Sequence, residues 1–210
     1  MNEATRIVRA DEEGGRLAAE VLCGGGVAVV PTDTVYGLAA RPTEAAAVRA
    51  VYRMKGRPEG MHLPVLAASE DQVRALGVAF TRGAEALARR WWPGPLTMAF
   101  GFDTRRRRPD WLDGRAEVAV RIPDHDFLRA LLEETGVLLV TSANPHGAPT
   151  PRVADDVSTA LGGAVDLVVD GGPLRDVPST LINVRGPEPS VEREGVISRA
   201  AVADALQGTT

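Results

Sequence analysis

The stretch Gly26–Gly37 reads GVAVVPTDTVYG, an apolar run that ends in a polar segment. Apolar runs of this length, flanked by glycine and proline, are typical of buried strands, so we expect a strand at about residues 26–31. Open α/β sheets bind ligands beyond the carboxyl ends of their strands. The segment 31–37 offers two threonine hydroxyls, a phenol and a glycine that lets a ligand approach the backbone. These features predict a ligand-binding loop, although an ordinary turn would also be rich in Thr and Asp.

Short apolar strands alternate with amphipathic helical windows along the rest of the chain. This alternation, with no linker rich in Pro, Gly or Ser, predicts a single α/β domain over residues 1–210. The expected helices lie at about 11–23, from a cap at Thr43 to Met54, after Ser69, at 81–91, 124–134 and 153–161, and after Ser198. The expected strands lie at about 26–31, 63–67, 96–102, 117–122, 137–141, 166–169, 180–184 and 195–198.

The composition limits the classes of protein that fit. The apolar runs are far shorter than a membrane span, and the amino terminus lacks the layout of a signal peptide, so we expect a cytoplasmic protein without membrane contact. Cys23 is the single cysteine and the three histidines lie far apart, which argues against a metal site built by the protein. The net charge of −4 argues against a general nucleic-acid binder. The run Arg105–Arg108 could contact RNA phosphates, or it could be a solvated turn.

Lysine occurs once among the 24 Lys and Arg residues, as Lys55 in the string MKGRP. An ammonium group is a compact charge, whereas a guanidinium group is a planar fork that suits bidentate contacts. Lys55 and Arg57 therefore offer both kinds of cation within three residues, which suits a polyphosphate or a carboxylate. Arginine-rich codon usage that left one lysine by chance would give the same pattern.

Ser142 and Asn144 follow the apolar run 137–141 in the string TSANP. Because they are two residues apart in an extended segment, their side chains point to the same side, where they could bind a phosphate or a base edge. An Asx turn before Pro145 is the alternative. The chain has neither a GxxxxGK[ST] phosphate loop nor a GxGxxG fingerprint after a strand, so any ATP would bind by another arrangement.

Eight short motifs follow one another along the chain. They are PTDTVYG (31–37), KGRP (55–58), WPGPLT (92–97), VAVRIP (118–123), TSAN (141–144), DGG (170–172), PST (178–180) and REG (193–195). This order closely resembles the YrdC-like family of threonylcarbamoyl-AMP synthases over about residues 13–200. The diagnostic set of that family, Lys-x-Arg followed later by Ser-x-Asn, is complete here. Two positions depart from the family pattern: His62, where proline or glycine is usual, and His146, where a serine is usual.

The resemblance implies a fold and an activity. The fold would be a single-domain, open, twisted mixed α/β sheet with flanking helices around a deep basic cavity, without an extra carboxyl-terminal domain. The activity would be synthesis of threonylcarbamoyl-AMP and pyrophosphate from L-threonine, bicarbonate and ATP, with Mg²⁺ that accompanies ATP and needs no dedicated protein cage. The product would feed the threonylcarbamoyladenosine modification of tRNA through a downstream threonylcarbamoyl-transferase complex.

The resemblance also implies roles for particular residues. Lys55 and Arg57 would be catalytic and would neutralise the phosphates of ATP. The ATP site would be completed by Ser142, Asn144 and Arg193, and threonine would be bound by Thr34, Arg121 and Ser179. Two other functions fit parts of the sequence: a module that binds double-stranded RNA or tRNA, and a carbamoyl-adenylate enzyme of another pathway, against which the short free-standing chain argues.

Overall fold

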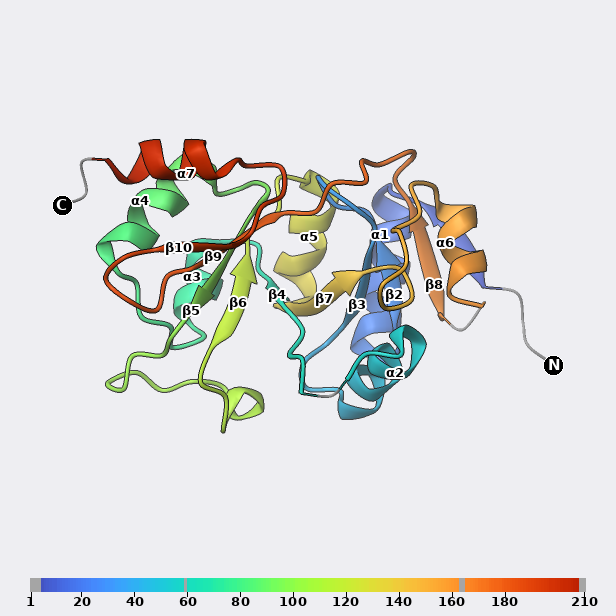
Figure 1. Cartoon of the computed structure of the whole chain (residues 1–210). Coiled ribbons are helices and arrows are strands. Elements are labelled where there is room, and N and C mark those ends of the chain that lie inside the picture. Colours follow the sequence, from blue (N-terminus) through green and yellow to red (C-terminus); the bar gives the residue numbers. More distant parts are fainter. Residues whose placement is uncertain (1–4, 59, 163–164, 208–210) are drawn as a thin grey trace.

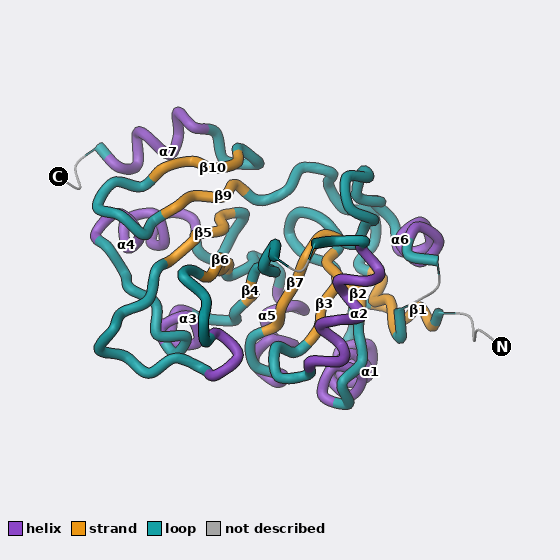
Figure 2. The backbone as a smooth tube through the Cα atoms, turned by 60° about the horizontal axis from the view of Figure 1, so that its bottom comes forward, coloured by secondary structure: helices purple, strands orange, loops and turns teal. Residues whose placement is uncertain are grey.

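The computed structural model describes residues 5–58, 60–162 and 165–207, and the described strands form one mixed sheet. The strands follow the spatial order β1-β8-β2-β3-β7-β4-β6-β5-β9-β10, which Figure 2 shows as a row across the molecule. The sheet is open, with β1 and β10 at its edges. The strand bounds are β1 Arg6–Arg9, β2 Ala28–Val30, β3 Gly37–Ala40, β4 Val65–Leu66, β5 Leu96–Phe100, β6 Val118–Arg121, β7 Leu138–Ser142, β8 Leu167–Asp170, β9 Thr180–Asn183 and β10 Ser190–Arg193.

Helices flank this sheet (Figure 1), so the predicted class of open mixed sheet with flanking helices is confirmed. None of the described helices is long and apolar enough to cross a membrane. A 3₁₀ turn spans Asp110–Leu112. The helix bounds are α1 Glu12–Cys23, α2 Ala45–Lys55, α3 Glu70–Arg74, α4 Arg82–Trp91, α5 Asp126–Thr135, α6 Ala154–Ala160 and α7 Arg199–Leu206.

The two faces of the sheet bury different sets of helices because side chains alternate along each strand. Ala28 and Val30 of β2 pack in one apolar cluster with Leu22 of α1 and Leu128 of α5. Val29, between them, points to the opposite face and joins the cluster that contains residues of α2, α4, α6 and α7. The α1 and α5 helices therefore cover one face of β8, β2, β3 and β7 and reach Leu66 of β4, while the described strands β6, β5 and β9 contribute no residue to this cluster.

Three predicted features differ from the structure. The expected strand at 195–198 is wrong, because β10 lies earlier, at Ser190–Arg193, where it pairs with β9 in antiparallel orientation. Residue Ile197 instead donates its backbone N–H to the Thr180 hydroxyl, 2.9 Å away. The expected cap at Thr43 is also wrong, because α2 begins after Glu44 and has no side-chain cap. Strands β1 and β3 were not predicted, since four-residue strands give too short a pattern to distinguish from loops.

Tyr36 joins two of the predicted motifs, PTDTVYG and DGG. Its side chain is fully buried, and its one hydroxyl proton is shared between the Gly172 carbonyl, 2.8 Å away, and an Asp170 carboxylate oxygen, 3.2 Å away. The hydroxyl oxygen of Tyr36 also accepts the Gly171 N–H at 3.1 Å. Burial raises the pKa of Tyr36 to about 12, so the phenol keeps its proton and remains a donor. The loop after β2 is thereby fixed to the loop after β8.

Replacing Tyr36 with phenylalanine removes this link and leaves part-buried polar groups of residues 170–172 without their partner. We expect the free energy of unfolding, measured by urea denaturation, to fall by about 1–3 kcal/mol. Tyr52→Phe is the matched control, because the Tyr52 hydroxyl donates to the exposed Met61 carbonyl, and we expect a change within about 0.5 kcal/mol. Equal losses in the two variants would contradict the assignment.

Candidate active site

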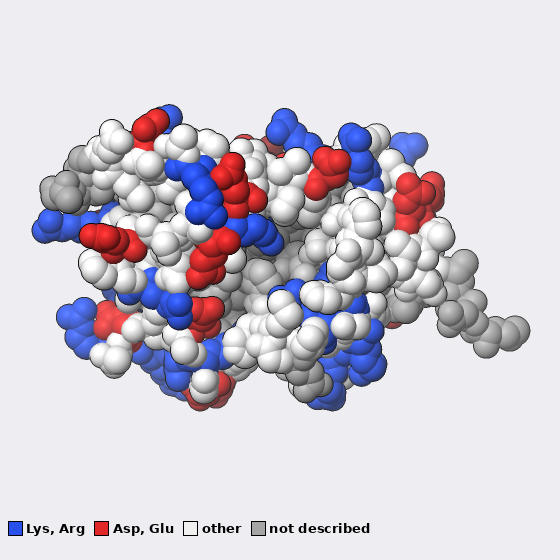
Figure 3. Space-filling model, viewed as in Figure 1, with Lys and Arg blue, Asp and Glu red and all other residues white. Residues whose placement is uncertain are grey.

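A cavity of about 300 Å³ lies at the middle of the sheet, between the loop after β2 on one side and strands β5, β6 and β9 on the other. Its floor is formed by small residues, Gly37, Ala99 and Ala119, which alternate with core residues such as Met98 and Val120 of the opposite face. Small side chains at these positions leave room for a ligand. In Figure 3 this face is hollowed between the two halves of the molecule, with basic and acidic side chains at the rim.

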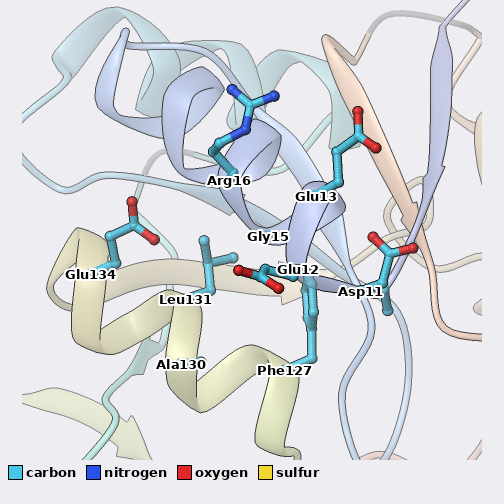
Figure 4. A pocket seen from close by; sticks show the side chains of 10 residues that line it. Asp11, Glu12, Glu13, Gly15, Arg16, Phe127, Ala130, Leu131 and Glu134 are labelled. Atoms are coloured by element: carbon cyan, nitrogen blue, oxygen red, sulfur yellow. The ribbon is translucent and has the colours of Figure 1, made fainter.

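Six of the eight predicted site residues line this cavity. They are Thr34, Arg57, Arg121, Ser142, Ser179 and Arg193. A larger cavity of about 1020 Å³ lies between α1 and α5 (Figure 4), where Phe127 and Leu131 are flanked by the carboxylates of Glu12, Glu13 and Glu134. None of the predicted residues lines that cavity. The convergence of polar groups from distant motifs marks the smaller cavity as the candidate active site.

Arg121 spans the cavity wall from the end of β6 to the loop after β2. Its side chain is buried and forms an ion pair with Asp33, in which Nη2 donates to the carboxylate. Nη1 donates to the Thr34 hydroxyl at 2.8 Å, and Nε donates to the Gly94 carbonyl at 3.0 Å. Burial lowers the pKa of Arg121, whereas the negative charge of Asp33 raises it. A guanidinium group has five N–H donors, so two remain beyond these three bonds.

The loop after β2 owes its shape to Thr32, whose side chain is buried. The Thr32 hydroxyl accepts the backbone N–H groups of Thr34 and Val35 at 3.0 and 3.1 Å and donates to the Val35 carbonyl at 2.7 Å. This threonine turn holds Asp33 and Thr34 in place to meet Arg121. The prediction of a ligand loop at this strand end therefore agrees with its position at the cavity.

The opposite wall carries a second group of hydroxyls. The Thr97 hydroxyl of β5 lies 2.7 Å from the Ser179 hydroxyl, and both side chains are buried. Arg193 of β10 donates to the Ser179 carbonyl at 2.9 Å. Thr97 was not among the predicted site residues. It ends the motif WPGPLT, and its membership of that motif could have identified it. Asp33 was missed in the same way, inside the PTDTVYG motif.

Lys55 and Asn144, the remaining two predicted residues, lie behind the cavity surface. Lys55 is 3% exposed and Asn144 is 7% exposed, and neither lines the cavity. The Lys55 ammonium donates to the Ser142 carbonyl at 2.5 Å and to the Asn144 carbonyl at 2.6 Å. Burial lowers the pKa of Lys55 to about 8, and the nearby charge of Arg57 acts in the same direction. The structure thus brings the diagnostic set together but exposes only Arg57 and Ser142 to the cavity.

The charges on the cavity wall are mixed. Arg57 lines the cavity with its guanidinium anchored to the Met61 carbonyl at 2.9 Å and the His62 carbonyl at 3.3 Å. Arg121 and Arg193 add two further cations, whereas Glu117 and Glu192 contribute carboxylates. Burial lowers the pKa of His62, which also lines the cavity, and the charge of Arg115 lowers it further.

The basic run 105–108 is paired with acidic neighbours. Its arginines contact aspartates in four ion pairs: Arg105 and Arg106 with Asp103 at 3.0 and 3.8 Å, Arg107 with Asp110 at 3.9 Å, and Arg108 with Asp113 at 3.2 Å. These carboxylates offset much of the positive charge that RNA phosphates would require. The geometry favours the interpretation of the run as a solvated turn.

Comparisons with known proteins agree with the motif order. The sequence model of the Sua5/YciO/YrdC family, described as telomere recombination, matches residues 20–195. The threonylcarbamoyl-AMP synthase of Bacillus subtilis (strain 168) is 35% identical over 187 residues, which cover 88% of this chain and 54% of that protein. The putative threonylcarbamoyl-AMP synthase of Mycobacterium leprae (strain TN) is 34% identical over 209 residues, or 98% of this chain and 94% of that protein.

Solved structures give the same result. The crystal structure of P. abyssi Sua5 complexed with L-threonine superposes with a TM-score of 0.87 at 32% identity, covering 97% of this chain and 61% of that one. E. coli YciO has a TM-score of 0.80 at 26% identity, covering 94% and 98%. The chain belongs to the Sua5/YciO/YrdC family. It spans about half the length of the B. subtilis relative and nearly all of the M. leprae relative.

The ion pair between Arg121 and Asp33 yields a prediction about stability. Asp33→Asn leaves a buried guanidinium without its counter-charge, so we expect the free energy of unfolding to fall by about 3–5 kcal/mol. Asp110→Asn removes the carboxylate of an exposed pair with Arg107 and should cost at most about 1 kcal/mol. Urea denaturation of both variants at pH 7 is the measurement. A loss in Asp33→Asn no larger than in Asp110→Asn would show that the pair does not hold the cavity wall.

Proposed function

We propose that this chain synthesises threonylcarbamoyl-AMP and pyrophosphate from L-threonine, bicarbonate and ATP. The observation that carries the proposal is the fixed guanidinium of Arg121, which has two N–H groups to spare in a cavity lined by hydroxyls. Relatives named threonylcarbamoyl-AMP synthase are 34–35% identical to the chain, and a relative of the same fold is known in complex with L-threonine. Both findings support the proposal.

The threonine end of the cavity is formed by Arg121, Thr34 and Ser179. A carboxylate accepts parallel N–H bonds from a guanidinium group, and the two remaining donors of Arg121 suit that contact. The Thr34 hydroxyl accepts a bond from Arg121 and lies 3.1 Å from the Thr32 hydroxyl, and by giving up that second contact it would turn its proton to a substrate oxygen or nitrogen acceptor. Ser179, paired with Thr97, offers a hydroxyl from the opposite wall. These groups would hold the amino acid while its amine attacks the carbon of bicarbonate, forming a carbamate and releasing water.

The nucleotide end follows from the other cavity-lining cations. Arg57 and Arg193 would neutralise the triphosphate, and the Ser142 side chain would contact it. The carbamate oxygen then attacks the α-phosphate and pyrophosphate leaves. Because this step brings anions together, its main requirement is preorganised positive charge and alignment of the reacting atoms, and no covalent enzyme intermediate is needed.

Magnesium would accompany ATP in this scheme. No group of three or more His, Cys, Asp or Glu side chains among the described residues could hold a metal ion. The two cavity carboxylates are also engaged, since Glu117 pairs with Arg185 at 2.6 Å and Glu192 accepts from Asn183 at 2.8 Å. Such a site fits a metal carried by the triphosphate, because Mg²⁺ often keeps several waters and uses few protein ligands. Bound there, it would add to the neutralisation of phosphate charge.

The proposal includes a cytoplasmic setting and delivery of the product to a threonylcarbamoyl-transferase complex that modifies tRNA. The mixed-anhydride product is reactive towards nucleophiles, including water. Direct delivery to a transferase would limit its loss by hydrolysis. The RNA-binding alternative has less support, because the arginines of its basic run are paired with aspartates. A carbamoyl-adenylate enzyme of another pathway would share the ATP chemistry and would differ in the amine that it accepts.

The decisive assay supplies ATP and Mg²⁺ with threonine and bicarbonate together, or with one omitted, and records pyrophosphate and the adenylate by mass spectrometry. We expect both products only in the complete mixture. Serine lacks one methyl group, and in a close-fitting pocket this should lower the specificity constant by roughly 10- to 200-fold. Pyrophosphate release at the same rate without threonine would contradict the proposed function.

A further inference from the structure

Lys55 has no donor left for a substrate. An ammonium group carries three N–H donors, and the structure gives them three acceptors: the Ser142 carbonyl at 2.5 Å, the Asn144 carbonyl at 2.6 Å and the Asn144 side-chain oxygen at 3.2 Å. The Lys55 backbone carbonyl also accepts the His146 N–H at 2.8 Å. Both ends of this residue therefore hold the segment 142–146.

Asn144 is committed in the same way. Its side-chain oxygen accepts from Lys55, and its amide nitrogen donates to the Pro145 carbonyl at 3.0 Å and the Ala148 carbonyl at 2.5 Å. An amide has two N–H donors, so both are used. Lys55 and Asn144 thus form a closed network behind the cavity, and the residue that this network presents to the cavity is Ser142.

We propose that Lys55 is a positioning residue, whose ammonium group locks the segment 142–148 so that Ser142 faces the cavity, and that it does not contact the phosphates of ATP. This inference rests on the proposed function for its link to catalysis, but the contact network itself does not. It divides the diagnostic set into a cavity pair, Arg57 and Ser142, and a supporting pair, Lys55 and Asn144.

The protonation state of Lys55 controls this lock. Arg57 is the charged group that acts on Lys55, and His146 is the titratable side chain on the segment opposite. Because burial lowers the pKa of Lys55 to about 8, the ammonium form prevails at pH 7. Above that pKa the amine keeps two N–H donors and directs a lone pair at carbonyl oxygens, so the segment should loosen.

Stability and activity should respond to this deprotonation in opposite senses. Unfolded Lys55 keeps the ordinary value of 10.5, so between pH 8 and 10.5 the unfolded chain binds the proton that the folded chain has lost. Linkage then makes the contribution of Lys55 to stability rise with pH across this window. Turnover should fall about tenfold per pH unit above about pH 8, as for loss of one essential proton. If turnover falls above about pH 8 while the protein stays folded, the loss of activity comes from lost positioning and not from unfolding.

The single lysine makes a direct test possible. Protein grown on lysine labelled with carbon-13 at Cε gives one NMR resonance in the whole chain, whose titration reports Lys55 alone. We expect a titration midpoint near 8. Saturating MgATP should move it by less than about half a unit, because phosphates that lie beyond about 4–6 Å from the ammonium have little effect on its pKa. A rise of one unit or more on adding MgATP, the effect of an opposite charge within about 4–6 Å, would overturn the proposal.

Two variants complete the test. Asn144→Asp places a carboxylate against the ammonium and should raise the midpoint of Lys55, and the alkaline limit of turnover with it, by one unit or more. Arg53→Met removes an exposed charge from the same helix end and should leave both unchanged. An unshifted midpoint in Asn144→Asp would overturn the proposal whether or not the enzyme turns over. If wild-type protein releases no threonine-dependent pyrophosphate while the NMR results hold, the proposed function fails and the contact network stands.

Discussion

The position of the Arg121 guanidinium is the constraint on which the cavity depends. Arg121 lies on β6, whereas Asp33 and Thr34 follow β2, and strands β3, β7 and β4 lie between β2 and β6 in the sheet. One side chain therefore connects β6 to the loop after β2, although β2 and β6 do not pair with each other in the sheet. Arg121 is buried and the Asp33 side chain is only 13% exposed, so removal of Asp33 would leave an uncompensated buried charge that costs several kcal/mol. The loop after β2 has little freedom to move without breaking this contact.

The same arrangement explains how a chain of net charge −4 can present a site for anions. Charge is placed locally: Arg121 is balanced by Asp33 within the wall, while Arg57 and Arg193 face the cavity. The hydroxyls of Thr34 and Ser179 reach the cavity from separate motifs, and each is held by a neighbouring polar group. Preorganised donors of this kind cost no reorganisation during a reaction between anions.

Much of the fold could be predicted because the buried strands and the longer helices have clear periods. The helix after Thr81 and the terminal helix after Ser198 begin where their capping residues predicted. Short strands were harder to predict. Strand β1, with Arg6 and Arg9 at its ends, has too few apolar residues to distinguish it from a loop. Residues 195–198 have a strand-like composition, but backbone N–H groups of this segment donate to the Thr180 hydroxyl instead of pairing in the sheet. Local pattern cannot report such long-range contacts.

The site could be predicted as a set of motifs but not as a geometry. Six of eight predicted residues meet at one cavity, and four of them lie at or just after the carboxyl end of a strand: Thr34, Arg121, Ser142 and Arg193. Sequence spacing could not show that Lys55 turns away from the cavity, because burial depends on the segment 142–148, about 90 residues further along. Nor could it identify Asp33 as the partner of Arg121, since this requires the two halves of the sheet to be folded against each other.

The central claim is that Arg121 is fixed with two guanidinium N–H groups free for the carboxylate of the amino acid. Isothermal titration calorimetry of wild-type protein and Arg121→Lys, with threonine and with ATP as separate ligands, tests it most directly. Lysine keeps the charge but lacks the planar fork, so threonine binding should weaken by at least about tenfold while ATP binding changes little. If Arg121→Lys weakens ATP binding and leaves threonine affinity unchanged, the account of the cavity is wrong.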